Sequence, residues 1–218
     1  MRRLLCIFLA LFMLLGLSAC TDESDNDYYS NNFFDEYPTG DEIITAEINK
    51  NPQATIKLSD GSEIIIELYY DAAPNAVSSF IAYADEDIYE TMAFTEVRNN
   101  CIVMTDVPDG DFSSPFYTVD EAENNSLSHT RGTVSMIRTS DSDTLTGKFF
   151  ILTKDQKHFD NNFTAFGKVI EGMDIIDEIA SSDNDNGVIK EPLSIKKVSV
   201  RTFGERIPKP TIILKNKR

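Results

Sequence analysis

The fold of this chain is decided by residues 147–173, GKFFILTKDQKHFDNNFTAFGKVIEGM. An apolar run at 149–152 predicts a short strand, and residues 163–169 predict a second strand after a polar excursion. Gly172 marks a turn, and the apolar spacing in Met173–Ala180 predicts an amphipathic helix. Two strands separated by a polar loop and followed directly by a helix form a specific, ordered pattern.

Upstream, residues 54–70 predict a β-hairpin, because apolar residues alternate with polar ones on both sides of Asp60-Gly61. An Asp-Gly pair between two such runs is a strong signal for a type I′ turn. Pro74 stands where a proline often begins a helix. The apolar residues that follow at spacings of three, four and seven predict a helix packed along one side: Val77, Phe80, Ile81 and Ala84.

Downstream, shorter alternating runs predict more strands, and polar segments at 108–128, 139–146 and 181–187 predict surface loops and a turn. The strands are expected within 92–104, with a break near 98–100, within 133–137, and within 193–203, where a slip at Lys196-Lys197 indicates a bulge. Roughly eight strands and two helices result. Closure of the sheet into a barrel capped by helices best removes the edges of so many short strands.

Two segments resemble one known family. Residues 64–94, IIIELYYDAAPNAVSSFIAYADEDIYETMAF, resemble the pattern I-x-I-E-L-x-x-D-x-A-P-x-x-V-x-x-F of the cyclophilin-type peptidyl-prolyl isomerases. Residues 147–173 resemble the later family pattern of F-F-I, a variable loop, W-L-D and V-F-G-K-V-x-E-G-M. The resemblance covers residues 54–203, and it implies a mainly β fold: a closed antiparallel eight-stranded barrel capped by two helices.

The resemblance also implies a chemistry. The family uses an arginine whose guanidinium donates to the proline imide, beside an apolar pocket that holds the proline ring. The pattern F-H-R-V-I-P-G-F-M-I-Q-G-G-D falls on residues 94–107, FTEVRNNCIVMTDV, so the arginine position holds Glu96. An ionised carboxylate cannot donate a hydrogen bond. Arg98, Arg138 and Lys148 can each form a salt bridge with Glu96 or supply a donor, and salt bridges are favoured; Arg98 and Arg138 are the better substitute donors, because a guanidinium presents several fixed N–H groups.

The apolar part of the family pocket is better retained than the polar part. The residues that the resemblance assigns to substrate binding are Ile102, Met104, Phe150, Phe159 and Phe163. His129 and His158 are the only histidines, and no acidic cluster stands at a metal-ligand spacing around them, so we expect neither a metal nor a cofactor. Cys101 precedes an apolar strand, which indicates a core residue rather than a nucleophile.

Residues 1–19 predict a signal peptide, because Arg2 and Arg3 precede an apolar run of about 14 residues, too short for a membrane span of about 20. Residues 17–20, Leu-Ser-Ala-Cys, resemble a bacterial lipobox, in which Cys20 becomes the lipidated first residue. An ordinary secretory signal and an uncleaved anchor are the alternatives. The lipobox implies a protein anchored in the bacterial cell envelope, at the outer membrane, on its periplasmic or surface face.

The mature chain then divides into three parts. Residues 20–45 are acidic and poor in aliphatic side chains, which predicts a disordered tether, or one partly pinned to the domain by its aromatic residues. Residues 46–204 form the cyclophilin-like domain. The basic tail, 205–218, is either a frayed end or a strand laid over the barrel.

The chain carries 20 Lys and Arg against 36 Asp and Glu, a net charge of −16. Such a balance excludes nucleic acid as a partner, because affinity for phosphates comes from clustered Lys and Arg. We expect a monomer that meets proline-containing polypeptide segments. Two functions stay open: an isomerase that assists the folding of exported proteins, weakened by Glu96, and a non-catalytic module that binds proline-containing or apolar segments. A third possibility is surface assembly through the acidic face.

Overall fold

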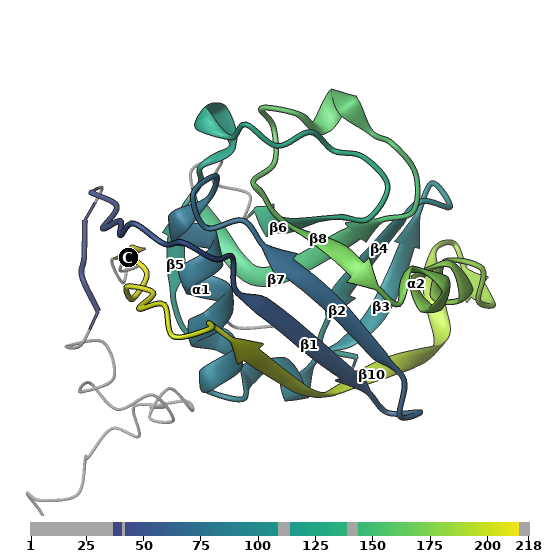
Figure 1. Ribbon diagram of the computed structural model, residues 1–218. Helices are drawn as coiled ribbons and strands as arrows, with labels where there is room; N and C mark the ends of the chain where they lie inside the picture. The colour runs from purple at the N-terminus through teal and green to yellow at the C-terminus, as the bar shows by residue number, and fades with distance from the viewer. Residues whose placement is uncertain (1–36, 41, 109–113, 139–143, 214–218) are drawn as a thin grey trace, which may run out of the picture. The chain divides into compact units, whose positions relative to one another are not determined.

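The computed structural model describes residues 37–40, 42–108, 114–138 and 144–213. The predicted signal peptide, Cys20 and most of the predicted tether lie outside these residues, as do parts of the predicted loops at 108–128 and 139–146. The described part of the chain is a closed β-barrel with two α-helices, which confirms the predicted fold class (Figure 1).

Eight antiparallel strands form the barrel wall, in the order β7, β4, β3, β10, β1, β2, β8 and β6, and β6 pairs again with β7. This last pairing closes the ring, so each strand of the wall has a neighbour on both sides. The bounds of these strands are β1 Gln53–Leu58, β2 Glu63–Leu68, β3 Ala93–Arg98, β4 Ile102–Asp106, β6 Thr133–Arg138, β7 Thr144–Leu152, β8 Ala165–Glu171 and β10 Val188–Arg201.

Shorter elements complete the described structure. Helix α1 (Pro74–Asp85) and helix α2 (Met173–Ala180) lie at opposite ends of the barrel in Figure 1. The predicted bounds of α2 are confirmed. The other elements are the 3₁₀ helices η2 (Ile88–Thr91), η3 (Ala122–Asn124) and η4 (Lys157–Phe159) and the short strands β5 (Tyr117–Val119), β9 (Asn184–Asp185) and β11 (Ile212–Ile213).

The β1–β2 hairpin is confirmed, but its predicted type I′ turn is wrong. A type I′ turn needs positive φ at both central residues. Here Gly61 has a φ of 91°, whereas Asp60 is not among the residues with positive φ. Gly61 N–H donates to the Leu58 carbonyl at 3.1 Å, and Leu58 N–H donates to the Ser62 carbonyl at 2.9 Å. The loop between the bonded residues Leu58 and Ser62 therefore has three residues, one more than a type I′ loop, and the Asp60 carboxylate accepts from the N–H and Oγ of Ser62.

The break predicted near 98–100 is a tight hairpin between β3 and β4. Asn99 and Asn100 both have a φ of 52°, the left-handed conformation that asparagine tolerates. The predicted bulge in β10 is also confirmed, because Lys57 pairs with Lys197 and Leu58 pairs with Ile195, which leaves Lys196 unmatched.

Helix α1 is buried on more sides than a one-sided stripe predicts. Val77, Phe80 and Ala84 are buried as expected, but Ile81 is only half-buried and Tyr83 is fully buried. The reason is that α1 enters the end of the barrel, where its Phe80 ring lies 4.9 Å from Tyr89. Phe80 also lies 5.7 Å from Phe149 and 5.4 Å from Phe166, so one helical residue joins the strands β7 and β8 in the core.

Gly147 makes room for Tyr83. A Cβ at position 147 would lie 1.9 Å from Cε1 of the Tyr83 ring, well inside van der Waals contact. Tyr83 cannot move away, because its hydroxyl donates to the Phe116 carbonyl at 3.0 Å and its side chain is completely buried. Position 147 therefore accepts glycine but no residue with a Cβ while Tyr83 keeps this place.

The N-terminus of α1 is capped from a distant segment. Its N-cap residue, Ala73, has no side chain that can accept a hydrogen bond, and Pro74 has no N–H. The carboxylate of Glu121 accepts the N–H of Asn75 at 3.0 Å and that of Ala76 at 2.8 Å. Burial raises the pKa of Glu121 to about 7, although these two backbone donors lower it.

Several segments predicted as loop, turn or tail contain strand residues instead; β7 already begins at Thr144, within 139–146, and β9 lies within 181–187. Residues 108–128 were expected as a polar surface loop, but β5 lies within them and pairs with β7, and Phe116 and Thr118 are buried. In the tail, β11 pairs with β5, and Ile212 is fully buried. Of the two alternatives for the tail, residues 212–213 therefore form a strand.

The end of the predicted tether also packs on this strand. Ile212 N–H donates to the Pro38 carbonyl at 2.8 Å, and the ring of buried Tyr37 lies 5.5 Å from that of Phe116. Residues 37–40 are thus held against the domain by β11 and by Tyr37. This agrees with the alternative that aromatic residues pin part of the tether to the domain. The strand β11 that holds these residues is more than 170 residues away in the sequence.

Substituting Gly147→Ala tests the close approach to Tyr83. We expect a loss of about 3 kcal/mol in the free energy of unfolding, because overpacking at a rigid site costs about 1–3 kcal/mol and this contact is far below normal separation. Urea denaturation measures the loss. In a Tyr83→Ala background the same substitution should cost less than about 0.5 kcal/mol, since the clash has been removed. An equal loss in both backgrounds would contradict the steric explanation.

Glu121→Gln tests the buried cap through its pH dependence. Because the pKa of Glu121 is raised to about 7, the folded state holds an extra proton between the ordinary pKa of 4.5 and pH 7. The stabilisation from this proton is complete below pH 4.5 and is lost as the pH rises through 7. We therefore expect the stability of Glu121→Gln relative to wild type to improve from pH 5 to pH 8, by at most about 1.4 kcal/mol per pH unit. A difference that does not change with pH would show that Glu121 is ionised throughout.

Candidate functional site

One outer face of the barrel gathers the residues that the sequence assigns to the site. Glu96 on β3 lies directly opposite Met104 on β4, and Met104 lies opposite Phe150 on β7. Arg98 in turn lies opposite Ile102. Residues opposite each other in a sheet project from the same face, so the arginine position and the pocket floor share one surface. A register shift between Phe94 and Glu96 sets this alignment.

All five predicted substrate-binding residues belong to one cluster, which we call the apolar cluster. Cys101, Ile102, Phe150 and Leu152 are its buried members, and Met104, Ile137, Phe159 and Phe163 are its partly buried members. The three phenylalanine rings pack edge to face. Phe159 lies 6.0 Å from Phe150 and 4.9 Å from Phe163, and Phe163 lies 5.5 Å from Phe150.

The apolar cluster has a floor and a rim. Phe150 is 3% exposed and Ile102 is 8% exposed, so they form the floor. Met104, Phe159 and Phe163 are half-buried and present the accessible apolar surface. Their elements differ: Met104 comes from β4, Phe159 from η4, and Phe163 from the loop before β8, since this strand begins at Ala165 rather than at 163 as predicted.

Glu96 and Arg98 form an ion pair at the edge of this floor. The Nε and Nη2 atoms of Arg98 both donate to Oε2 of Glu96, at 2.9 and 2.8 Å. The side chain of Arg98 is 60% exposed and that of Glu96 is 33% exposed. A guanidinium has five N–H donors, so three remain after this contact. Glu96 thus holds the cation of Arg98 near the place where the family has its arginine.

The two other predicted cations also have acidic partners. Arg138 Nη1 lies 3.4 Å from Asp120 Oδ2, and the Arg138 guanidinium stands 5.3 Å above the centre of the Phe163 ring. Lys148 Nζ donates to Asp106 Oδ2 at 2.8 Å. Arg138 therefore borders the rim of the apolar cluster but pairs with Asp120, not with Glu96.

A buried polar network lies beneath the cluster, and sequence analysis did not find it. His129 Nδ1 is 2.9 Å from Asp160 Oδ1, and its Nε2 is 2.8 Å from Ser135 Oγ. Burial lowers the pKa of His129, while its hydrogen bond to Asp160 opposes that shift. The order of groups is that of a Ser-His-Asp triad, but Ser135 is 0% exposed and therefore cannot reach a substrate.

This network supports the aromatic rim. Asp160 follows Phe159 directly, and its Oδ1 also accepts the His129 N–H at 2.7 Å. The His129 ring stacks at 6.4 Å from Phe150 and meets the edge of Phe159 at 5.9 Å. No local pattern signals the network, because 31 residues separate His129 from Asp160 and only the fold brings them together.

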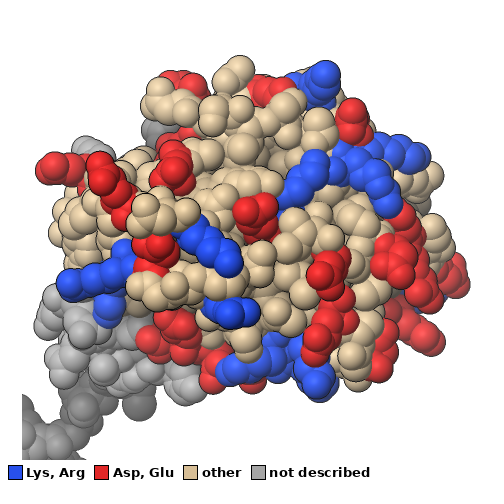
Figure 2. Space-filling model, in the orientation of Figure 1, with Lys and Arg blue, Asp and Glu red and all other residues tan. Residues whose placement is uncertain are grey.

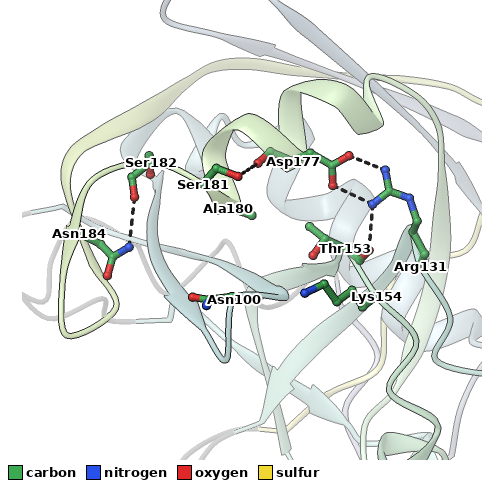
Figure 3. A pocket seen from close by; sticks show the side chains of 9 residues that line it. All are labelled: Asn100, Arg131, Thr153, Lys154, Asp177, Ala180, Ser181, Ser182 and Asn184. Carbon is green, nitrogen blue, oxygen red and sulfur yellow. Dashed lines mark hydrogen bonds and ion pairs between the residues drawn. The ribbon is translucent and has the colours of Figure 1, made fainter.

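A polar cavity of about 520 Å³ lies between the end of α2, the β3–β4 hairpin and the segment after β7 (Figure 3). Asn100, Thr153, Lys154 and the end of α2 at Ser181 contribute to its wall. Arg131, on its border, donates from Nη1 to Asp177 Oδ1 at 2.7 Å and to the Thr153 carbonyl at 2.8 Å.

Other chemistries find no support in the part of the chain that the structure describes. There, no group of three or more His, Cys, Asp or Glu is arranged to hold a metal ion. Cys101 is buried, which agrees with a core residue, and Gln156 Nε2 donates to its Sγ at 3.1 Å.

No helix among the described residues is long and apolar enough to cross a membrane. Figure 2 shows Lys and Arg interspersed with Asp and Glu over the visible face.

Comparison with known proteins agrees with this geometry. Residues 54–200 match the family described as cyclophilin type peptidyl-prolyl cis-trans isomerase/CLD. A peptidyl-prolyl cis-trans isomerase of Acinetobacter baylyi is 30% identical over 176 residues, which cover 74% of this chain and 92% of the relative. Peptidyl-prolyl cis-trans isomerase B of Bacillus subtilis is 34% identical over 128 residues, covering 58% of this chain and 89% of the relative.

Among solved structures, a cyclophilin type peptidyl-prolyl cis-trans isomerase of Cryptosporidium parvum has a TM-score of 0.62 and 21% identity, covering 69% of this chain and 98% of that one. A second structure of that protein, with a TM-score of 0.61 and 22% identity, was determined in the presence of the dipeptide Ala-Pro. At this identity the likeness shows the fold alone. The family match over the whole barrel and the bacterial relatives go further, and they show that this chain belongs to the cyclophilin-type peptidyl-prolyl cis-trans isomerases.

Proposed function

We propose that this cyclophilin-type isomerase accelerates cis–trans exchange at Xaa-Pro bonds of exported proteins, at a rate that Glu96 reduces. The observation that carries the proposal is the apolar cluster, in which Ile102, Met104 and Phe150 form one face with the Glu96–Arg98 pair. An apolar floor with a cation at its edge is the arrangement that proline isomerisation requires.

The reaction needs little covalent chemistry. The barrier of about 18–20 kcal/mol comes from amide resonance, and it falls when the imide nitrogen loses conjugation. The chain's residues act in two ways. The half-buried rings of Phe159 and Phe163 with Met104 hold the proline ring by apolar contact. A donor placed at the imide nitrogen stabilises its lone pair in the transition state, when that lone pair becomes available.

Arg98 is the guanidinium best placed to donate. It lies on the same strand face as Glu96, two residues on, and its remaining N–H groups are not used by the ion pair. The donor is displaced by two residues along β3 from the family position, because Arg98 faces Ile102 rather than Met104. This displacement and the nearby carboxylate, which competes for the donor, are the physical reasons for a reduced rate.

The location in the cell envelope rests on residues 1–20. The basic start, the short apolar run and Cys20 after small residues support export and lipidation. Two or more acyl chains at Cys20 hold a protein stably at a membrane, because each buried methylene contributes about 0.8 kcal/mol. The clients at that location are exported polypeptides with exposed proline residues.

Restoring the family residues tests the catalytic role of this position. In the double variant Glu96→Arg/Arg98→Ile the guanidinium stands opposite Met104 without a competing carboxylate. We expect kcat/KM for an Xaa-Pro tetrapeptide to rise on the order of 100-fold, because one preorganised donor contributes about 10²–10³ in rate. NMR exchange spectroscopy on the full chain in detergent measures the rate without a coupled protease.

The matched control is Glu191→Arg, an equal change of charge at an exposed position of β10. It should leave the rate unchanged. Arg98→Ala should remove most of the activity that wild type has, whereas Arg98→Lys should retain part of it. If wild type and the double variant are both inactive although proline peptides still bind, the chain is a binding module and the catalytic proposal is wrong.

Cys20→Ser tests the anchor. A serine cannot carry the thioether lipid, so we expect the variant to move from the membrane fraction to the soluble fraction after export. Mass spectrometry should find acyl groups on the Cys20 peptide of wild type and none on the corresponding peptide of the variant. Cys101→Ser serves as the control, because this buried thiol has no part in lipidation. A Cys20→Ser protein that stays in the membrane fraction would show that another segment anchors the chain.

A further inference from the structure

Two wall residues of the polar cavity are direct sequence neighbours of residues in the apolar cluster. Asn100, in its wall, precedes the cluster residue Cys101, and Thr153, also in its wall, follows the cluster residue Leu152. The two sides are tied together, because Thr153 N–H donates to the Cys101 carbonyl at 2.9 Å. A chain held in the cluster therefore passes this cavity if it continues toward the β3–β4 hairpin.

The cavity carries one unbalanced positive charge. Its charged wall residues are Arg131, Asp177 and Lys154, and the first two neutralise each other. Among the residues that the structure describes, no acidic group or hydrogen-bond acceptor is paired with the Lys154 ammonium. Figure 3 shows the end of the Lys154 side chain directed toward Asn100, opposite the end of α2.

Three carbonyls near the end of α2 are already bonded within the chain. The last carbonyls of a helix present partial negative charge, and such bonds reduce it. Ser181 N–H donates to the Asp177 carbonyl at 3.1 Å and to the Glu178 carbonyl at 3.0 Å, and Ser182 N–H donates to the Ile179 carbonyl at 3.1 Å. Lys154 is therefore the charged residue of the wall whose charge no other wall residue neutralises.

We propose that the cavity receives an acidic side chain of the substrate, Asp or Glu, near the proline, and that Lys154 is the specificity-determining residue. The inference rests on the proposed function of the apolar cluster and names its substrate class. In a chain of net charge −16, acidic peptides are repelled overall. A local unpaired cation reverses that repulsion at one place.

The distance is compatible with a short peptide. Lys154 follows Phe150 by four residues, so their Cα atoms are at most about 14 Å apart. An extended peptide spans that distance in about four residues. The volume of about 520 Å³ lies within the range of about 300–1,000 Å³ that is typical of ligand pockets.

The test uses fluorescent Xaa-Pro peptides that differ at one position, with Glu, Gln or Lys placed one to four residues from the proline on either side. Anisotropy with the full chain in detergent gives the dissociation constants. At the best position we expect the Glu peptide to bind about fivefold more tightly than the Lys peptide, as for an exposed ion pair. The ratio should fall toward one at about 0.5 M NaCl.

Charge reversal identifies the responsible residue. Lys154→Glu should invert the preference, and Lys154→Gln should abolish it. Lys196→Glu, the same change at the exposed bulge of β10, should leave it intact. Equal binding of the three peptides at every position would overturn the inference. A preference for the Glu peptide that survives in Lys154→Glu would also overturn it, as would the absence of any peptide binding. A Glu preference that persists without isomerisation would support this site while contradicting the proposed catalysis.

Discussion

The pairing of β6 with β7 is the constraint on which the rest of the structure depends, because it joins the two ends of the strand order into a ring. Val134 pairs with Ile151 and Ser135 with Phe150. Phe150 thereby has β4 on one side and β6 on the other, and its ring becomes the floor of the apolar cluster. On an open sheet the same residue would lie on an exposed edge strand.

Closure also positions the loop that covers this floor. Ser135, which pairs with Phe150 in the backbone, bonds through its Oγ to His129, and His129 bonds to Asp160. Asp160 in turn fixes the segment that carries Phe159. A single polar chain therefore connects the closing strand with the aromatic rim, and each of its buried polar atoms has a partner, as burial in a medium of low dielectric requires.

The charged residues around the apolar cluster differ from the family pattern, whereas the apolar residues largely keep it. The apolar residues keep the volume and the face that a proline ring needs, whereas Glu96 takes the place of a cation. Arg98, Arg138 and Lys148 each pair with an acid of this chain. Membership of the family therefore fixes the architecture and the class of reaction, while the rate depends on where one guanidinium lies.

The sequence by itself determined the strand and helix pattern, the bounds of α2, the bulge in β10 and the membership of Ile102, Met104, Phe150, Phe159 and Phe163 in one cluster. These features follow from periodicity and from an ordered resemblance, and both are local in the chain. Predictions were wrong where a distant partner overrides the local pattern. The end of the barrel buries Tyr83 rather than Ile81, and β5 forms within 108–128 because it pairs with β7.

Only the tertiary structure decided the partners of the charges. It paired Arg98 with Glu96 and Arg138 with Asp120, placed Glu121 at the start of α1, joined His129 to Asp160, and left Lys154 unpaired beside the cavity among the described residues. The physical reason is range. Hydrophobic periodicity depends on residues that are close in the sequence. An ion pair or a buried hydrogen bond depends on atoms a few ångströms apart in space, and these atoms can belong to residues far apart in the chain.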